Sequence, residues 1–132
     1  MLVVDASVLV VGLLDDGPAG RSVRARLRGE QLVAPSHIDL EVISAWRGLA
    51  RSGRIPAERI QDAVGDLQDF PMRRIVPTAL LARCWELRDN ITPYDAAYVV
   101  LAEALETTLL TADERLARAS GPRCAVEVMD LS

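Results

Sequence analysis

The sequence predicts an α/β domain in which helices cover both faces of a parallel β-sheet. Short apolar segments alternate with longer helical segments along the whole chain, which is the pattern of a buried parallel sheet. Half of the 132 residues are hydrophobic, which is enough for one sizeable core. No linker, internal repeat or low-complexity stretch interrupts the pattern. We therefore expect residues 1–132 to form a single domain.

The expected strands are short apolar runs, and the first ends directly at a charged residue. They lie at residues 2–4, 32–34, 74–76, 108–111 and 125–129. The intervening segments predict helices at 6–14, 21–28, between 36 and 53, from 56 to about 70, and at 78–88, 94–106 and 113–119. Ser36 and Thr78 are the expected N-caps of two of these helices, and Gly53 is an expected terminator.

Composition and charge narrow the classes of function. The net charge is −4 and every basic side chain is Arg, so no mechanism that needs a lysine is available. A nucleic acid would have to meet a local arginine patch. The two cysteines lie far apart, and Cys84 sits among leucines as expected for a buried small hydrophobe. Without a signal peptide or a run of roughly 20 apolar residues, we expect a soluble cytoplasmic protein.

Four acidic residues differ in position from the other acids, most of which lie on predicted solvent-exposed helix faces. Asp5 and Asp113 follow predicted strands, at the sheet edge where open α/β folds place their chemistry. Glu41 borders an apolar helix stripe, and Asp95 lies near the start of the most apolar helix. Structural alternatives exist, since Asp95 and Asp113 are also suited to cap helices. A purely structural explanation is weakest for Asp5, which lies at the end of a strand.

Converging carboxylates repel one another, and burial makes each charge costly. A divalent cation relieves both problems, and Mg²⁺ and Mn²⁺ prefer oxygen ligands. Such a site suits phosphodiester hydrolysis by a metal-activated water.

The four segments that carry these acids together resemble the PIN domain, and closely the toxins of VapC type. The matching stretches are residues 3–7, 35–42, 92–98 and 110–116. The resemblance implies a three-layer α/β/α fold with a five-stranded parallel sheet. It further implies an endoribonuclease that uses Mg²⁺ or Mn²⁺ to cut single-stranded or loop RNA, leaving a 5′-phosphate and a 3′-hydroxyl.

The resemblance assigns roles to individual residues of this sequence. The implied metal ligands and catalytic residues are Asp5, Glu41, Asp95 and Asp113, with Asp5 and Asp113 central. Ser7 and Thr111 match hydroxyl positions that support these acids through hydrogen bonds, although ordinary helix-start and strand-end roles would also explain them. Leu116 stands near a position where the family sometimes carries a further acid, so the number of ions stays open. Asp39 faces away from Glu41 on the same helix, which favours Glu41.

The partners follow from the same resemblance and from the arginines. Arg47 and Arg51 follow Glu41 at roughly helical spacing and are candidates for RNA binding, with a solvated face as the alternative. Trp46 and Trp85 are expected in the core or in an interface. The resemblance implies a homodimer and an antitoxin protein whose arginine could enter the acidic groove.

Other classes fit less well. A receiver domain needs a lysine, and a haloacid-dehalogenase-type phosphatase needs a second acid where Ser7 stands. A Ser-His-Asp hydrolase would have to use the single histidine, His37, and this sequence has no Gly-x-Ser-x-Gly nucleophile elbow. No Gly-rich phosphate loop follows the first strand. The alternatives that stay open are a PIN-domain nuclease of RNA processing or of DNA, and a non-catalytic PIN-like binding module.

Overall fold

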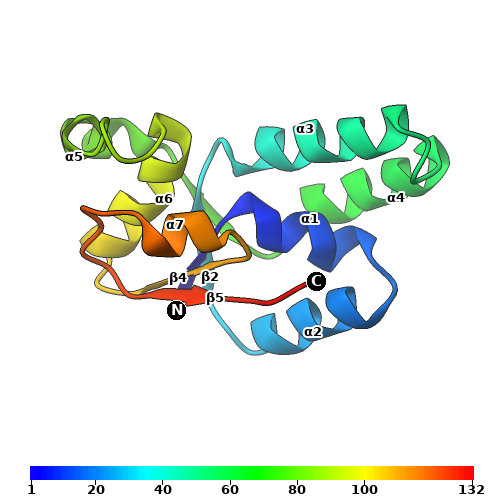
Figure 1. Ribbon diagram of the computed structural model, residues 1–132. Helices are drawn as coiled ribbons and strands as arrows, with labels where there is room; N and C mark the ends of the chain where they lie inside the picture. The colour runs from blue at the N-terminus through cyan, green and yellow to red at the C-terminus, as the bar shows by residue number, and fades with distance from the viewer.

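A five-stranded sheet organises the chain, and all of its strands are parallel. The computed structural model describes residues 1–132 and gives the strand order β3-β2-β1-β4-β5 (Figure 1). The strands are β1 Leu2–Val4, β2 Leu32–Pro35, β3 Arg73–Ile75, β4 Thr108–Thr111 and β5 Val126–Val128. The predicted five-stranded parallel sheet is confirmed, and each strand lies within two residues of its expected position.

The helices lie in two layers, with α1 to α4 on one side of the sheet and α5 to α7 on the other (Figure 1). Right-handed connections between parallel strands require this division, because the order of the strands reverses at β1. The bounds are α1 Ala6–Leu14, α2 Pro18–Leu27, α3 Ile38–Arg51, α4 Ala57–Gln68, α5 Leu81–Glu86, α6 Pro93–Ala104 and α7 Glu114–Arg118, with a 3₁₀ turn η1 at Pro77–Leu80.

The core is a single cluster of 27 buried hydrophobic residues. All three residues of β1 are buried, and α6 is buried continuously from Ala96 to Ala102. Asp5 and Thr111 are the polar or charged residues that are buried with this core. Asp5 directly follows β1 and Thr111 ends β4, so both lie at the carboxyl ends of central strands.

Two expected helix caps are wrong. The Ser36 N–H donates to the Ile75 carbonyl at 2.8 Å, so this residue continues the pairing of β2 with β3. The helix α3 begins later, after His37, whose side chain makes no capping bond. Thr78 lies inside η1, because Pro77 already starts that turn. Gly53 follows α3 with a φ of +74°, as expected for a helix terminator.

The two tryptophans have different environments. Trp46 is fully buried and its Nε1–H donates to the Val10 carbonyl at 3.1 Å, so it belongs to the core as predicted. Trp85 is 67% exposed and stacks with Arg88 at 4.5 Å, so it is not a core residue of this chain. Cys84 is buried and both cysteines are free. No helix in the structure combines the length and apolar character needed to cross a membrane.

The close contact between α1 and α2 depends on Gly20. Its N–H donates to Asp15 Oδ2 at 2.7 Å, and a Cβ atom at this position would lie 1.8 Å from the Asp15 carbonyl oxygen. Gly48, in the middle of α3, has no atom within 4 Å of such a Cβ. The first glycine is therefore required by packing, and the second is not.

We expect Gly20→Ala to lower the free energy of unfolding by about 1–3 kcal/mol, because the backbone must move to relieve the clash. Gly48→Ala, the matched control, should raise it by about 0.5–1 kcal/mol through helix propensity. Urea denaturation followed by circular dichroism measures both. A Gly20→Ala protein as stable as the wild type would contradict this account of the α1–α2 contact.

Candidate active site

The parallel register of the sheet brings two of the candidate acids to the same edge. Val4 of β1 pairs with Leu110 of β4, and the Asp5 N–H donates to the Leu110 carbonyl at 3.2 Å. Asp113 follows β4 by two residues. Residues more than 100 positions apart in the sequence therefore meet at the carboxyl ends of neighbouring central strands, as this class of fold predicts.

Asp5 is the buried charge of the site, with only 6% of its surface exposed. Its carboxylate accepts hydrogen bonds from the Ser7 N–H at 3.0 Å, from the Ser7 hydroxyl, and from the Thr111 hydroxyl at 2.5 Å. Burial raises the pKa of Asp5, the bonds from Ser7 and Thr111 oppose this rise, and the charge of Asp95 adds to it. Asp5 also caps α1, so the expectation that it has the weakest structural role is wrong.

The two hydroxyl groups connect Asp5 to the turn that carries Asp113. The Ser7 hydroxyl accepts a hydrogen bond from the Ala112 N–H at 2.9 Å. The Thr111 hydroxyl accepts one from the Asp113 N–H at 2.9 Å while it donates to Asp5. The backbone position of one acid is therefore coupled, through two side chains, to the carboxylate of another.

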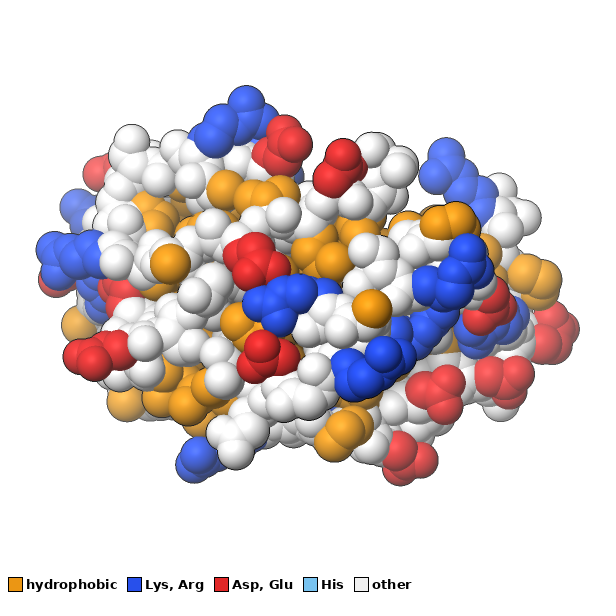
Figure 2. Space-filling view, turned by 90° about the horizontal axis from the view of Figure 1, so that it is seen from below, with side chains coloured by type: hydrophobic (Ala, Val, Ile, Leu, Met, Phe, Trp, Pro, Cys, Tyr) orange, Lys and Arg blue, Asp and Glu red, His pale blue; other side chains and the backbone are white.

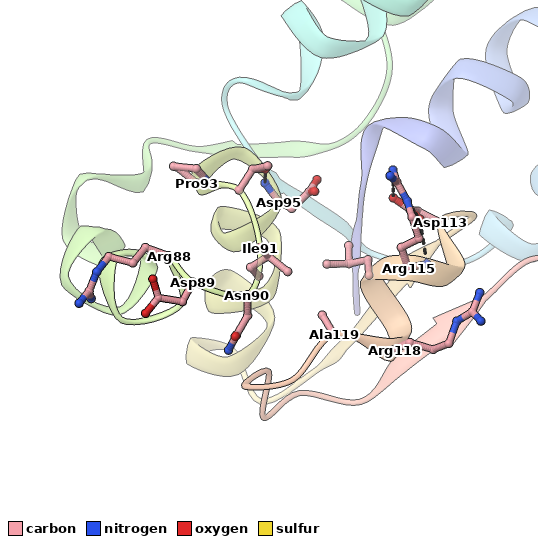
Figure 3. Close-up of a pocket in the computed structure, with 12 residues that line it drawn as sticks. Arg88, Asp89, Asn90, Ile91, Pro93, Asp95, Asp113, Arg115, Arg118 and Ala119 are labelled. Carbon is pink, nitrogen blue, oxygen red and sulfur yellow. Dashed lines mark hydrogen bonds and ion pairs between the residues drawn. The ribbon is translucent and has the colours of Figure 1, made fainter.

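Asp95 and Asp113 line the same open cavity of about 820 Å³, which lies between the loop before α6 and the helix α7. Figure 3 shows the Asp95 carboxylate pointing across this cavity toward the segment that carries Asp113. Burial raises the pKa of Asp95, and the negative charge of Asp113 raises it further. The helix cap is Thr92, whose hydroxyl accepts from the Asp95 N–H at 3.2 Å, so the capping alternative for Asp95 is wrong.

Asp113 has a structural role as well as its place in the cavity. Its Oδ1 caps α7 by accepting from the Arg115 N–H at 2.9 Å. The Arg115 guanidinium also contacts both carboxylate oxygens, each at 3.3 Å. Burial works against ionisation of Asp113, but the hydrogen bonds from Arg115 outweigh it and lower the pKa. The capping alternative for Asp113 is therefore correct, and it leaves the carboxylate facing the cavity.

Glu41 is positioned by two aromatic side chains. The hydroxyl of the buried Tyr98 donates to Glu41 Oε1 at 2.5 Å, and His37 Nε2 lies 3.3 Å from the same oxygen. Burial raises the pKa of Tyr98, and the charges of Glu41, Asp5 and Asp95 contribute to the rise. Tyr98 thus lies among three of the acids. Its position one helical turn after Asp95, on the same face of α6, is the sequence signal for this role.

The remaining candidates are placed differently. Both carboxylate oxygens of Asp39 pair with Arg74, at 2.8 and 3.0 Å, so this acid is committed to an ion pair outside the cavity. Arg47 and Arg51 are exposed on α3, which runs away from the sheet edge (Figure 1), and neither forms an ion pair. Leu116 is buried beneath the cavity.

The donor chemistry of the site fits a divalent cation, although a complete ligand shell is not preformed. No three Asp, Glu, His or Cys side chains are close enough together to hold one ion. Burial is the main cause of the raised pKa values of Asp5 and Asp95, and the charge of Asp95 adds to the first and that of Asp113 to the second. Mg²⁺ is commonly held by one or two carboxylates and several waters, which matches the two acids of the cavity.

The raised pKa of Asp95 predicts a pH-dependent gain in stability for Asp95→Asn in EDTA. The folded protein holds the Asp95 proton more tightly than the unfolded chain, whose pKa is near 3.8, so folding loses stability as the pH rises through both values. The Asn side chain of the variant does not ionise, so the variant does not lose this stability as the pH rises. It should melt a few degrees higher than the wild type at pH 7. The two melting temperatures should converge below the ordinary Asp pKa.

Differential scanning calorimetry across this pH range measures the effect. Asp62→Asn on the exposed face of α4 is the matched control and should leave the melting temperature unchanged. An Asp95→Asn protein that melts below the wild type at pH 7 would show that Asp95 stabilises the ion-free fold.

Comparison with known proteins supports the family. The PIN domain model matches residues 2–122. Ribonuclease VapC3 of Mycobacterium tuberculosis is 42% identical over 118 residues, covering 89% of this chain and 86% of the relative. Ribonuclease VapC9 of the same species is 38% identical over 129 residues, covering 98% of each chain.

Solved structures show the same fold. PAE2754 from Pyrobaculum aerophilum superposes with a TM-score of 0.71 at 25% identity, covering 96% of this chain and 83% of the other. VapBC2 from Rickettsia felis, crystallised with a DNA fragment from its promoter, gives a TM-score of 0.65 at 15% identity and covers 98% of each chain. The sheet topology, the match to the family model and the full-length relatives together show that this chain belongs to the PIN-domain family, among the ribonucleases of VapC type.

Proposed function

We propose that this protein is a divalent-metal-dependent endoribonuclease and the toxin of a toxin–antitoxin pair. The observation that carries the proposal is that Asp5 and Asp113 follow the neighbouring strands β1 and β4 while Asp95 of α6 lies close enough for its charge to raise the pKa of Asp5 and for the charge of Asp113 to raise its own. The names of the full-length relatives, which are ribonucleases, support RNA as the substrate. Mg²⁺ or Mn²⁺ is the ion that this set of oxygen donors favours.

The ligands that we propose are Asp5, Asp95 and Asp113, with Glu41 completing the set directly or through a water. A bound divalent ion lowers the pKa of a water molecule and neutralises charge that develops on the phosphate. Ser7 and Thr111 hold the Asp5 carboxylate through hydrogen bonds and keep the Asp113 turn against it. Tyr98 orients Glu41 by donating to one of its oxygens.

RNA binding must use local positive charge, because the chain carries a net charge of −4. Figure 2 shows a band of basic side chains, flanked by acidic ones, on the face that carries α2. Arginines of α2 are engaged within the chain, since Arg24 donates to two carbonyls and Arg26 pairs with Glu127. Arg47 and Arg51 are exposed and without an ionic partner, so we propose that these two contact the RNA backbone.

A protein antitoxin is the partner that we propose, and the VapBC2 complex of Rickettsia felis supports it. An antitoxin arginine would find two carboxylates in the cavity that Asp95 and Asp113 line, and a charge-assisted pair there would block the site. Both cysteines are free, in keeping with the cytoplasmic location that we also propose.

A homodimer completes the proposal. Leu81 and Trp85 are 56% and 67% exposed and lie four residues apart, on one face of α5. Val76, which precedes η1, is 68% exposed. Large apolar side chains exposed together are typical of protein interfaces, and a second copy of this chain is the occupant that we propose for this face.

Catalysis should depend on the negative charge of Asp5. Asp5→Asn removes the charge that the proposed ion needs, so Mn²⁺-dependent RNA cleavage should fall by about 100-fold or more. Gel analysis of a structured RNA, with the purified chain free of any partner, measures the rate. EDTA should abolish cleavage by the wild type, and the products should carry 5′-phosphates that a ligase can join.

Asp62→Asn is the matched control for this experiment, because it removes an exposed carboxylate on α4 and should cleave at the wild-type rate. Cleavage that persists in EDTA would contradict the metal mechanism. A wild-type chain that binds RNA but cleaves neither RNA nor DNA with either ion would favour the non-catalytic module instead.

The proposed dimer should depend on the exposed apolar side chains of α5. Trp85→Ser combined with Leu81→Ser removes the exposed apolar face of α5 and should convert the dimer to a monomer. Light scattering coupled to size-exclusion chromatography measures the mass, and circular dichroism checks the fold. Leu40→Ser, at an apolar side chain of α3 that is 73% exposed, is the control and should stay dimeric. A double variant that remains dimeric would place the interface elsewhere.

A further inference from the structure

Arg115 is the basic side chain that reaches the carboxylates of the cavity. Its Nε and Nη2 atoms each lie 3.3 Å from an oxygen of Asp113, so the guanidinium spans both oxygens. Figure 3 shows Arg115 beside Asp113 at the end of the cavity toward which Asp95 points. The positive charge also acts on Asp95, whose pKa it lowers against the larger effects of burial and of Asp113.

This contact is easily broken. The Arg115 side chain is 89% exposed, and Asp113 is its hydrogen-bond partner within the chain. Bonds of 3.3 Å are long for a charge-assisted pair, which usually measures 2.7–2.9 Å. The cap of α7 uses the Arg115 backbone N–H, so the helix start does not depend on where the side chain points.

A divalent ion bound to Asp113 would compete with the Arg115 guanidinium for the lone pairs of these two oxygens. The two cations also repel each other at this distance. The displaced guanidinium remains at the rim of the cavity, where five N–H donors suit the oxygens of a phosphate. An exposed arginine beside a metal-bound phosphodiester is well placed to hold the RNA backbone.

We infer that Arg115 is a mobile counter-ion of the site, which pairs with Asp113 in the ion-free protein and turns to the RNA backbone when the divalent ion binds. This inference rests on the proposed function, because it takes Asp113 as a ligand of the ion. It adds a basic side chain to the four acids that we propose for the site. When no divalent ion is bound, the Arg115 guanidinium partly neutralises the charge of Asp113.

The first test measures Mn²⁺ affinity without RNA by isothermal titration calorimetry. Arg115→Ala should bind Mn²⁺ roughly two- to fivefold more tightly than the wild type, because the ion no longer displaces an exposed ion pair. Arg118→Ala is the matched control. Arg118 lines the same cavity but pairs with Glu114, so its removal should leave the affinity unchanged.

The second test measures binding of a short phosphorothioate RNA by fluorescence anisotropy, once in Mn²⁺ and once in EDTA. In Mn²⁺, Arg115→Ala should bind about threefold more weakly, and the slope of log affinity against log salt should shrink by about 0.7, the value for one contact to a single strand. In EDTA the variant should bind no more weakly than the wild type. Arg115→Lys keeps the charge and should restore the salt dependence in Mn²⁺, but only part of the affinity, because it lacks the planar donor fork.

The outcomes separate this inference from the proposed function. Mn²⁺ binding that Asp5→Asn abolishes and Arg115→Ala leaves unchanged would overturn the inference and keep the function. An equal loss of RNA affinity in Mn²⁺ and in EDTA would make Arg115 a permanent RNA contact and would also overturn it. A wild-type protein that binds no Mn²⁺ would overturn both.

Discussion

The burial of the Asp5 carboxylate is the constraint on which the rest of the site depends. A charge with 6% of its surface exposed, at the end of a fully buried strand, is costly unless it is paired or hydrogen-bonded. The Ser7 N–H and two hydroxyl groups offset part of this cost, and the pKa of Asp5 stays raised. The hydroxyls of Ser7 and Thr111 also accept hydrogen bonds from N–H groups of the turn after β4. The groups that bind the Asp5 carboxylate therefore also fix the backbone position of Asp113.

The cavity is lined by arginines and acids in equal number, namely Arg88, Arg115, Arg118, Asp89, Asp95 and Asp113. Most arginines near acidic groups form ion pairs on the outside of the fold, as Arg74 does with Asp39 and Arg83 with Glu103. Arg115 alone reaches an acid of the cavity, and its side chain is free to leave. If Arg115 moves away, the Asp113 carboxylate becomes available to a cation, while exposed arginines elsewhere are available for a polyanion.

Family membership and geometry support the same chemistry from different directions. The relatives associate the chain with ribonucleases, whereas the structure shows which side chains hold which acids. Leu116 is buried where the family sometimes carries a further acid, which removes one possible ligand for a second ion. A cavity lined by two carboxylates suits an ion that completes its ligand shell with water and substrate oxygens.

The sequence by itself determined the fold class and the candidate acids, because both depend on local patterns. Apolar runs and helical segments predicted the five strands, and acids that directly follow strands predicted the active edge. The matched segments at residues 3–7 and 110–116 predicted the roles of Ser7 and Thr111. Apolar strand runs of this kind are expected in any sequence that buries a parallel sheet on both faces.

Only the tertiary structure decided how the acids are held. That Thr92 rather than Asp95 caps α6, that Tyr98 holds Glu41, and that Arg115 covers Asp113 all depend on side-chain geometry. The exposure of Trp85 likewise depends on what the rest of the fold leaves uncovered. Periodicity assigns a residue to a face of a helix, but it cannot say which atoms meet across elements that are distant in the chain.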